Sequence, residues 1–264
     1  MNNKGIGVFD SGLGGLTVVK EIMNLLPKEQ IFYLGDTARF PYGTKTKETI
    51  VRFSKETTSF LLKKNVKMIV VACNTSSALA LKELKKSFNI DIIGVIEAGA
   101  RAAVEVTNNK KIGLIGTRAT IGSGVYREAI RKYDPKIKVF VKATPLLVPL
   151  VEEGWLSNKI TEMILTQYLK DFRKKKIDTL VLGCTHYPLL KPLIRKILPN
   201  VNIIDSAREM AKTVRALLEA RDMTASKNNR KKSAFFVTDT PETFNKIGRM
   251  FLKKDMIEAQ KVRI

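Results

Sequence analysis

The chain has 264 residues, 44% of them hydrophobic, which is enough for one large folded domain or two of ordinary size. No apolar run approaches the ~18 residues that cross a bilayer, and the N-terminal MNNKGIGVFD reads as a Gly-punctuated strand rather than a signal peptide, so we expect a cytoplasmic protein with no membrane partner. The 47 lysines and arginines against 25 acidic residues give a formal net charge of +22.

This positive charge raises the possibility of nucleic-acid binding. The basic residues are spread along helical segments, with two short clusters at Arg173–Lys176 and Arg230–Lys232 and few aromatic residues between them. That distribution is typical of a solvated, lysine-rich surface, so we expect nucleic acid not to be required. Cys73 and Cys184 form no disulfide framework, and with a single histidine they supply at most three Cys/His ligands, so we expect no metal.

Apolar runs of strand length alternate with longer amphipathic stretches along the chain. In chain order, we expect strands at Gly5–Phe9, Ile31–Gly35, Met68–Ala72, Ile92–Ile96, Lys111–Ile115, Lys138–Ala143, Thr179–Leu182, Val201–Asp205 and Ser233–Val237. We expect helices at Gly15–Leu26, Thr46–Lys64, Ser76–Phe88, Gly99–Val106, Gly122–Lys132, Pro145–Glu152, Ser157–Lys174, Pro188–Leu198 and Ala207–Ala220. This alternation predicts an α/β fold with mainly parallel sheets flanked by helices.

The two halves of the chain resemble each other. Residues 4–22, KGIGVFDSGLGGLTVVKEI, and residues 111–130, KIGLIGTRATIGSGVYREAI, both run from a strand through a small polar turn into a helix. Each half also has a strand that ends in a cysteine followed by polar residues, VVACNTSS at 70–77 and LVLGCTHYP at 180–188. We therefore expect two pseudo-symmetric domains.

Four polar turns follow expected strands, at residues 10–12, 73–76, 117–120 and 184–186. Ligands of open α/β sheets bind beyond the carboxyl ends of the strands, where such turns present amide groups and side chains. If the two halves face each other, Cys73 and Cys184 also face each other across the cleft between the domains, where we expect the active site.

The stretch GVFDSGLGG at 7–15 has two interpretations. Its glycines partly match a dinucleotide-binding fingerprint, with Asp36 about where a ribose-binding acid would lie, but Thr17 stands in place of the third glycine. The turn equally suits a carboxylate held by backbone amides and Ser11, with Asp10 as acceptor for an ammonium group or partner of a thiol.

Three other polar positions could be structural or functional. Asp36 precedes a turn at Pro41-Tyr42-Gly43 that an ordinary loop also explains, and Glu152 belongs to the surface unless its segment lines the cleft. His186 follows Cys184 by two residues, where an imidazole can hold a thiolate.

The paired cysteines leave three chemistries open. A redox dithiol needs the sulfurs within bonding distance, and a covalent hydrolase uses a single nucleophile. A two-base proton transfer needs one acid/base group on each face of a flat carbanion, which a pseudo-symmetric cleft supplies directly.

Taken together, these motifs resemble those of bacterial glutamate racemases in the aspartate/glutamate racemase superfamily, in order and over nearly the whole chain. The stretches that carry the resemblance are Asp10-Ser11-Gly12, Gly35-Asp36-Thr37, Pro41-Tyr42-Gly43, Ala72-Cys73-Asn74-Thr75, Pro149-Leu150-Val151-Glu152 and Gly183-Cys184-Thr185-His186.

The resemblance implies a cofactor-independent isomerase that interconverts L- and D-glutamate and supplies D-glutamate for peptidoglycan. It implies Cys73 and Cys184 as catalytic bases, with Cys184 acting on L-glutamate and Cys73 on D-glutamate. The substrate-binding residues that it implies are Asp10, Ser11, Tyr42, Gly43, Asn74, Thr75, Thr117, Thr120, Thr185 and His186, and the auxiliary groups are Asp36 and Glu152.

The resemblance also implies a homodimer and a discontinuous first domain, residues 1–97 completed by the C-terminal segment 207–264, with residues 98–206 as the second domain. Two alternatives stay open. An aspartate racemase of the same superfamily would share both thiols, and a non-enzymatic basic binding protein could share the fold.

Overall fold

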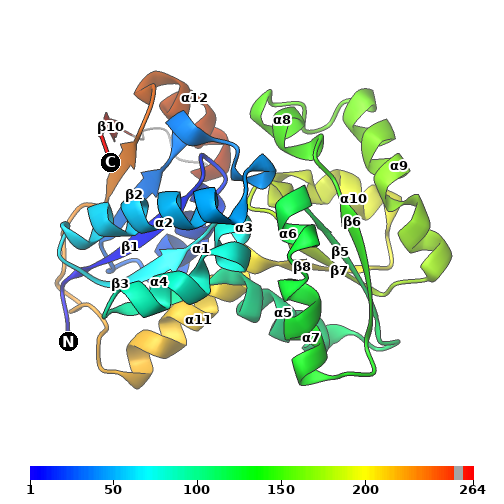
Figure 1. Ribbon diagram of the computed structural model, residues 1–264, viewed down its shortest axis with the longest axis horizontal. Coiled ribbons are helices and arrows are strands. Elements are labelled where there is room, and N and C mark those ends of the chain that lie inside the picture. Colours follow the sequence, from blue (N-terminus) through cyan, green and yellow to red (C-terminus); the bar gives the residue numbers. More distant parts are fainter. Residues whose placement is uncertain (253–257) are drawn as a thin grey trace.

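Two lobes, each built on a sheet, make up the computed structural model, which describes residues 1–252 and 258–264 (Figure 1). The first lobe has a six-stranded sheet in the order β10-β9-β2-β1-β3-β4. Its strands are β1 (Gly5–Asp10), β2 (Ile31–Gly35), β3 (Val66–Val71), β4 (Asp91–Gly94), β9 (Ala234–Val237) and β10 (Ala259–Lys261). The second lobe has the order β6-β5-β7-β8. Its strands are β5 (Lys111–Gly116), β6 (Lys138–Ala143), β7 (Thr179–Gly183) and β8 (Asn202–Asp205).

All strand pairs described in both sheets are parallel, as the alternating pattern predicted. The central strands β1, β3 and β7 are buried along their whole length, because helices cover both faces of each sheet. The parallel arrangement brings the carboxyl ends of β1 and β3 to one edge of the first sheet, and those of β5 and β7 to one edge of the second.

Helices flank both sheets. The first lobe carries α1 (Leu16–Leu25), α2 (Lys47–Leu62), α3 (Asn74–Leu79), α4 (Leu81–Ser87), α11 (Ser206–Ala220) and α12 (Pro241–Leu252), with short 3₁₀ turns η1 (Thr37–Arg39) and η2 (Tyr42–Thr44). The second carries α5 (Val95–Val106), α6 (Arg118–Gly122), α7 (Val125–Tyr133), α8 (Leu147–Glu152), α9 (Lys159–Lys175), α10 (Lys191–Ile197) and η3 (Tyr187–Leu190). None of the described helices combines the length and the apolar character needed to span a bilayer.

The structure corrects the expected strand Ile92–Ile96. Strand β4 ends at Gly94, and Val95 and Ile96 begin helix α5, which therefore starts four residues before the expected Gly99. Both residues are buried, so their apolar character did not distinguish a strand end from a helix start.

Two expected helices differ from the observed ones. The segment Ser76–Phe88 breaks at Ala80 into α3 and α4. The expected helix Gly122–Lys132 corresponds to α7, and the sequence did not predict α6, which precedes it. The two helices are separated at Gly124, whose φ of 73° lies in the left-handed region that favours glycine. Helix α6 begins at Arg118 because the Thr117 side chain accepts a hydrogen bond from the Thr120 amide and caps it. The sequence reading also missed α12 and the short edge strand β10.

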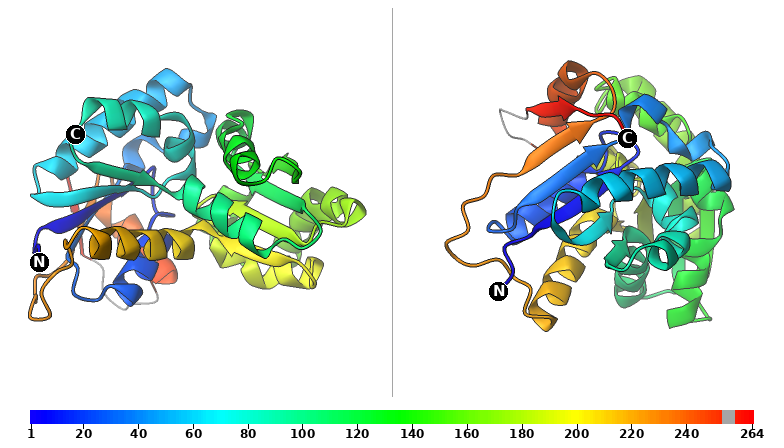
Figure 2. Two further views of the ribbon diagram at one scale, coloured as in Figure 1. Left: turned by 90° about the horizontal axis from the view of Figure 1, so that it is seen from below. Right: turned by 60° about the vertical axis from the view of Figure 1, so that its left-hand side comes forward.

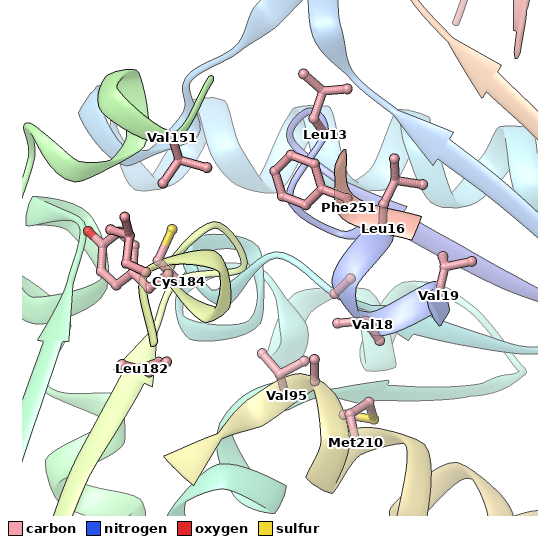
Figure 3. Close-up of a cluster of buried hydrophobic side chains, with 14 of the residues drawn as sticks. Leu13, Leu16, Val18, Val19, Val95, Val151, Leu182, Cys184, Met210 and Phe251 are labelled. Carbon is pink, nitrogen blue, oxygen red and sulfur yellow. The ribbon is translucent and has the colours of Figure 1, made fainter. Parts of the chain in front are cut away.

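The lobes share a continuous hydrophobic core. In Figure 3, Leu16 and Val19 of α1 and Phe251 of α12 lie on one side of this cluster, and Val151 and Cys184 of the second lobe lie on the other. Helix α11 packs against both α1 and α5, and Figure 2 shows it running along the first lobe toward the second. This shared packing holds the two lobes face to face.

Candidate active site

A cavity of about 200 Å³ lies between the lobes, at the carboxyl ends of the strands. The first lobe contributes Ser11, Phe40, Pro41, Tyr42, Gly43, Thr44, Cys73, Asn74 and Thr75 to its lining. The second contributes Thr117, Arg118, Pro145, Val148, Pro149, Gly183, Cys184, Thr185 and His186. The turns that follow β1, β3, β5 and β7 therefore converge on one cavity, with one cysteine from each lobe.

Cys73 comes two residues after the end of β3 and directly before α3. Its side chain is 5% exposed, and its Sγ lies 3.7 Å from the Ser11 hydroxyl. Burial, followed by the negative charge of Asp10, raises the pKa of the Cys73 thiol to about 11. At neutral pH Cys73 is therefore held as a thiol that can give up a proton.

Cys184 has a different environment. It is 6% exposed, and its Sγ lies 3.8 Å from Nδ1 of His186, whose Nε2 lies 2.9 Å from a carboxylate oxygen of Glu152. Burial acts to lower the pKa of His186, but the hydrogen bonds to Cys184 and Glu152 outweigh burial and raise it to about 10. The imidazole is therefore protonated at neutral pH and places a positive charge beside the Cys184 sulfur.

Asp10 is buried behind the cavity wall and does not line it. Its carboxylate accepts hydrogen bonds from the Gly12 amide at 3.0 Å and the Thr185 hydroxyl at 3.3 Å. Burial raises the pKa of Asp10, and the opposing effect of the His186 charge is the next largest. Asp10 thus connects the turn after β1 to the turn that carries Cys184.

Three threonines meet across the lobes. The Thr75 hydroxyl lies 3.0 Å from that of Thr117 and 3.1 Å from that of Thr120, and the last two are 2.9 Å apart. Thr75 and Thr117 line the cavity, whereas Thr120 is buried behind them. These hydroxyls form a polar cluster suited to a carboxylate.

Tyr42 and Gly43 form another part of the lining. The Tyr42 hydroxyl donates to Asp36, which is fully buried, lies outside the lining and also accepts from Arg39 at 2.7 Å. Burial, and then the charge of Asp36, raises the pKa of Tyr42, which keeps the phenol a donor. A Cβ on Gly43 would lie 2.7 Å from Cβ of Thr117, so this turn approaches the second lobe too closely for any other residue.

Most of the expected residues therefore line the cavity, while Asp10, Asp36, Thr120 and Glu152 lie behind it and hydrogen-bond to residues that do. Eight further lining residues were not among the predicted site residues: Phe40, Pro41, Thr44, Arg118, Pro145, Val148, Pro149 and Gly183. Arg118 lies in the polar turn at residues 117–120, so its position was a usable signal. Pro41, Pro149 and Gly183 lie in the stretches that carry the family resemblance and could have been included on that ground. Within the described part of the chain, no cluster of three or more His, Cys, Asp or Glu side chains is arranged to hold a metal ion.

The chain is similar to known racemases over nearly its whole length. The family model described as Asp/Glu/Hydantoin racemase matches residues 6–214. A glutamate racemase of Geobacter metallireducens is 47% identical over 250 residues, which are 94% of this chain and 93% of that protein. The crystal structure of glutamate racemase from Francisella tularensis in complex with D-glutamate has a TM-score of 0.93 and 41% identity, covering 100% and 98% of the two chains. A glutamate racemase isoform from Bacillus anthracis has a TM-score of 0.96 and 41% identity, covering 100% and 99%.

Proposed function

The chain belongs to the Asp/Glu/Hydantoin racemase family, and from this membership we propose that it interconverts L- and D-glutamate, with Cys73 and Cys184 as the two acid/base groups. Racemisation of an amino acid makes the protein an isomerase. The observation that carries the proposal is that one cavity is lined by a cysteine from each lobe, among hydroxyl and amide side chains that can donate hydrogen bonds. A two-base proton transfer needs one proton donor or acceptor on each face of the amino acid, and a cysteine from each lobe supports that role.

The two cysteines have different roles in this mechanism. The positive charge of His186 lies 3.8 Å from the Cys184 sulfur, which suits Cys184 to act as the base, whereas the raised pKa of Cys73 keeps that residue a thiol. The Cys184 thiolate removes the Cα proton of L-glutamate, the electron pair stays on Cα, and the Cys73 thiol delivers its proton to the opposite face. The reverse direction starts from D-glutamate with the thiolate at Cys73.

The Cα–H bond of an amino acid is weakly acidic, so the carbanion needs stabilisation. Negative charge spreads into the α-carboxylate as the proton leaves, and preorganised donors around that carboxylate lower the barrier. Ser11, Asn74, Thr75 and Thr185 line the cavity and carry such donors. Because both lobes hold these side chains in place around the cavity, their dipoles need little reorientation as the charge develops.

Cα exchange in D2O tests the activity and the substrate together. The protein is incubated separately with L-glutamate and L-aspartate, and loss of each Cα proton signal is followed by NMR, with optical rotation as a second measurement. We expect exchange and racemisation of glutamate. Exchange of aspartate alone would assign the chain to the aspartate racemase alternative, and no exchange on either would reject the proposal.

Two cysteine variants test the mechanism. Cys73→Ala and Cys184→Ala should each abolish racemisation while the circular dichroism spectrum and thermal midpoint stay close to wild type, because each removes a single sulfur from the cavity wall. Normal turnover by either variant would exclude a two-cysteine mechanism.

The wider context follows from family resemblance. We propose that D-glutamate made here enters peptidoglycan synthesis in the cytoplasm, and that the protein acts as a homodimer, which sedimentation at micromolar concentration tests. We also propose domain boundaries at 1–97 with 207–264, and at 98–206. Sheet membership supports these boundaries, since β1–β4, β9 and β10 form one sheet and β5–β8 the other.

A further inference from the structure

The Asn74 side chain has one satisfied and one unsatisfied polar atom. Asn74 is the first residue of α3, is 2% exposed and lines the cavity. Its Oδ1 accepts a hydrogen bond from the Tyr126 hydroxyl at 2.7 Å, whereas its Nδ2 has no hydrogen-bond partner among the described residues. A buried N–H group without a hydrogen-bond partner lowers the stability of the fold. We therefore expect a ligand in the cavity to accept a hydrogen bond from Nδ2.

The orientation of this amide depends on its neighbour. An asparagine side chain can turn over and exchange its oxygen with its nitrogen, so its hydrogen-bond partners decide which atom faces the site. The Tyr126 phenol is fully buried and burial raises its pKa, so the hydroxyl keeps its proton. The nearby Ser206 side chain opposes this rise in pKa but does not outweigh burial. A Tyr126 hydroxyl that donates to Asn74 selects the amide oxygen and leaves Nδ2 free.

We propose that Tyr126 is a positioning residue of the active site: its hydroxyl holds the Asn74 amide so that Nδ2 donates to a carboxylate oxygen of the substrate. The inference rests on the proposed function, because it takes an amino-acid carboxylate as the acceptor. Tyr126 lies on α7 of the second lobe and does not line the cavity, whereas Asn74 belongs to the first lobe. The donor is therefore oriented by contact between the lobes.

Tyr126→Phe tests this role, because it removes one oxygen atom and keeps the ring that packs in the core. We expect kcat/KM for both enantiomers of glutamate to fall about 10-fold, which is typical for a weakened hydrogen bond to a charged group. Calorimetry should show D-glutamate binding weakened to a similar extent. Tyr133→Phe is the matched control, since Tyr133 lies on the same helix and its hydroxyl bonds to Glu97 at the surface. It should behave as wild type.

A double-mutant cycle separates positioning from a general structural effect. If Tyr126 acts through Asn74, then adding Tyr126→Phe to Asn74→Ala should change kcat/KM by less than about 2-fold, because the amide that the hydroxyl orients is already absent. The same fold loss in both backgrounds would overturn the proposal. Wild-type activity of Tyr126→Phe alone would also overturn it.

A second variant tests the amide orientation if Tyr126→Phe fails to fold, as judged by thermal melting. Asn74→Asp keeps an oxygen for Tyr126 but replaces the free N–H donor by a negative oxygen, so D-glutamate binding should fall at least 10-fold. Unchanged binding would overturn the proposal. A wild-type protein that racemises no glutamate would reject the proposed function, whereas an active wild type with an unaffected Tyr126→Phe variant would reject only the positioning role.

Discussion

The different environments of the two cysteines predict different rates of alkylation by iodoacetamide. Both sulfurs line the same cavity and are equally buried, so a small reagent reaches both by one route. Only the thiolate reacts at a useful rate. Burial disfavours the charged form of Cys73 and raises its pKa to about 11, whereas Cys184 lies 3.8 Å from the protonated His186.

The magnitude follows from the ionised fraction. A thiol with a pKa of about 11 is about 0.1% thiolate at pH 8, whereas an ordinary cysteine with a pKa of ~8.5 is about one-quarter thiolate. Cys73 should therefore react about 200-fold more slowly than an ordinary cysteine at pH 8, and its rate should rise about tenfold per pH unit up to pH 10. Cys184 should be labelled first.

Mass spectrometry of the peptides that contain each cysteine, sampled over time between pH 7 and 10, measures both rates in one protein. D-glutamate should protect both residues because it fills the shared cavity. His186→Asn should slow the labelling of Cys184 and leave that of Cys73 near its wild-type value. Equal labelling of the two cysteines at pH 8, or a Cys73 rate independent of pH, would refute the assignment of thiol and thiolate.

Three further variants probe stability and the site. Lys67 and Glu29 form an ion pair in the protein interior, with 2.6 Å between Nζ and the carboxylate oxygen. Lys67→Met leaves the buried charge of Glu29 without its partner, so the free energy of unfolding should fall by about 3–5 kcal/mol, measured by urea denaturation. Gly14→Ala would place a Cβ 2.5 Å from Nδ1 of His186, so kcat should fall by at least about 100-fold in a protein that still folds, measured by racemisation assay and circular dichroism. Arg118→Gln removes the one arginine or lysine among the described residues of the cavity lining. Because glutamate carries a net negative charge, its KM should rise about 3-fold at low salt and converge with wild type at about 1 M salt, measured by steady-state kinetics.

Each of these variants has a matched control. Lys212→Met breaks an exposed ion pair with Glu209 and should change stability by less than about 1 kcal/mol. Gly122→Ala adds a Cβ that meets nothing within 4 Å and should stay active. Arg101→Gln removes a half-exposed arginine paired with Glu105 away from the cavity, and should leave KM unchanged. Equal effects in a variant and its control would contradict the corresponding argument.

Local sequence patterns determined much of the fold. Strands β1, β3, β5 and β7 were predicted close to their observed bounds, because a strand buried on both faces must be an apolar run and each one ends at a polar turn. The placement of Cys73 and Cys184 at strand ends followed from the same pattern. Their presence in one cavity followed from the repeated plan of the two halves.

Contacts between distant residues decided the remainder. The boundary between β4 and α5 depends on how buried apolar residues pack, which Val95 and Ile96 do not reveal by type. The Tyr126–Asn74 hydrogen bond joins residues of different lobes, and nothing in the helical pattern around Tyr126 marks it. The sequence by itself thus determined which residues end the strands and supply the chemistry, because strand burial and turn chemistry are local. Only the tertiary structure decided that Glu152 lies against the imidazole beside Cys184 and which amide atom of Asn74 faces the cavity, because these contacts form where separate segments meet.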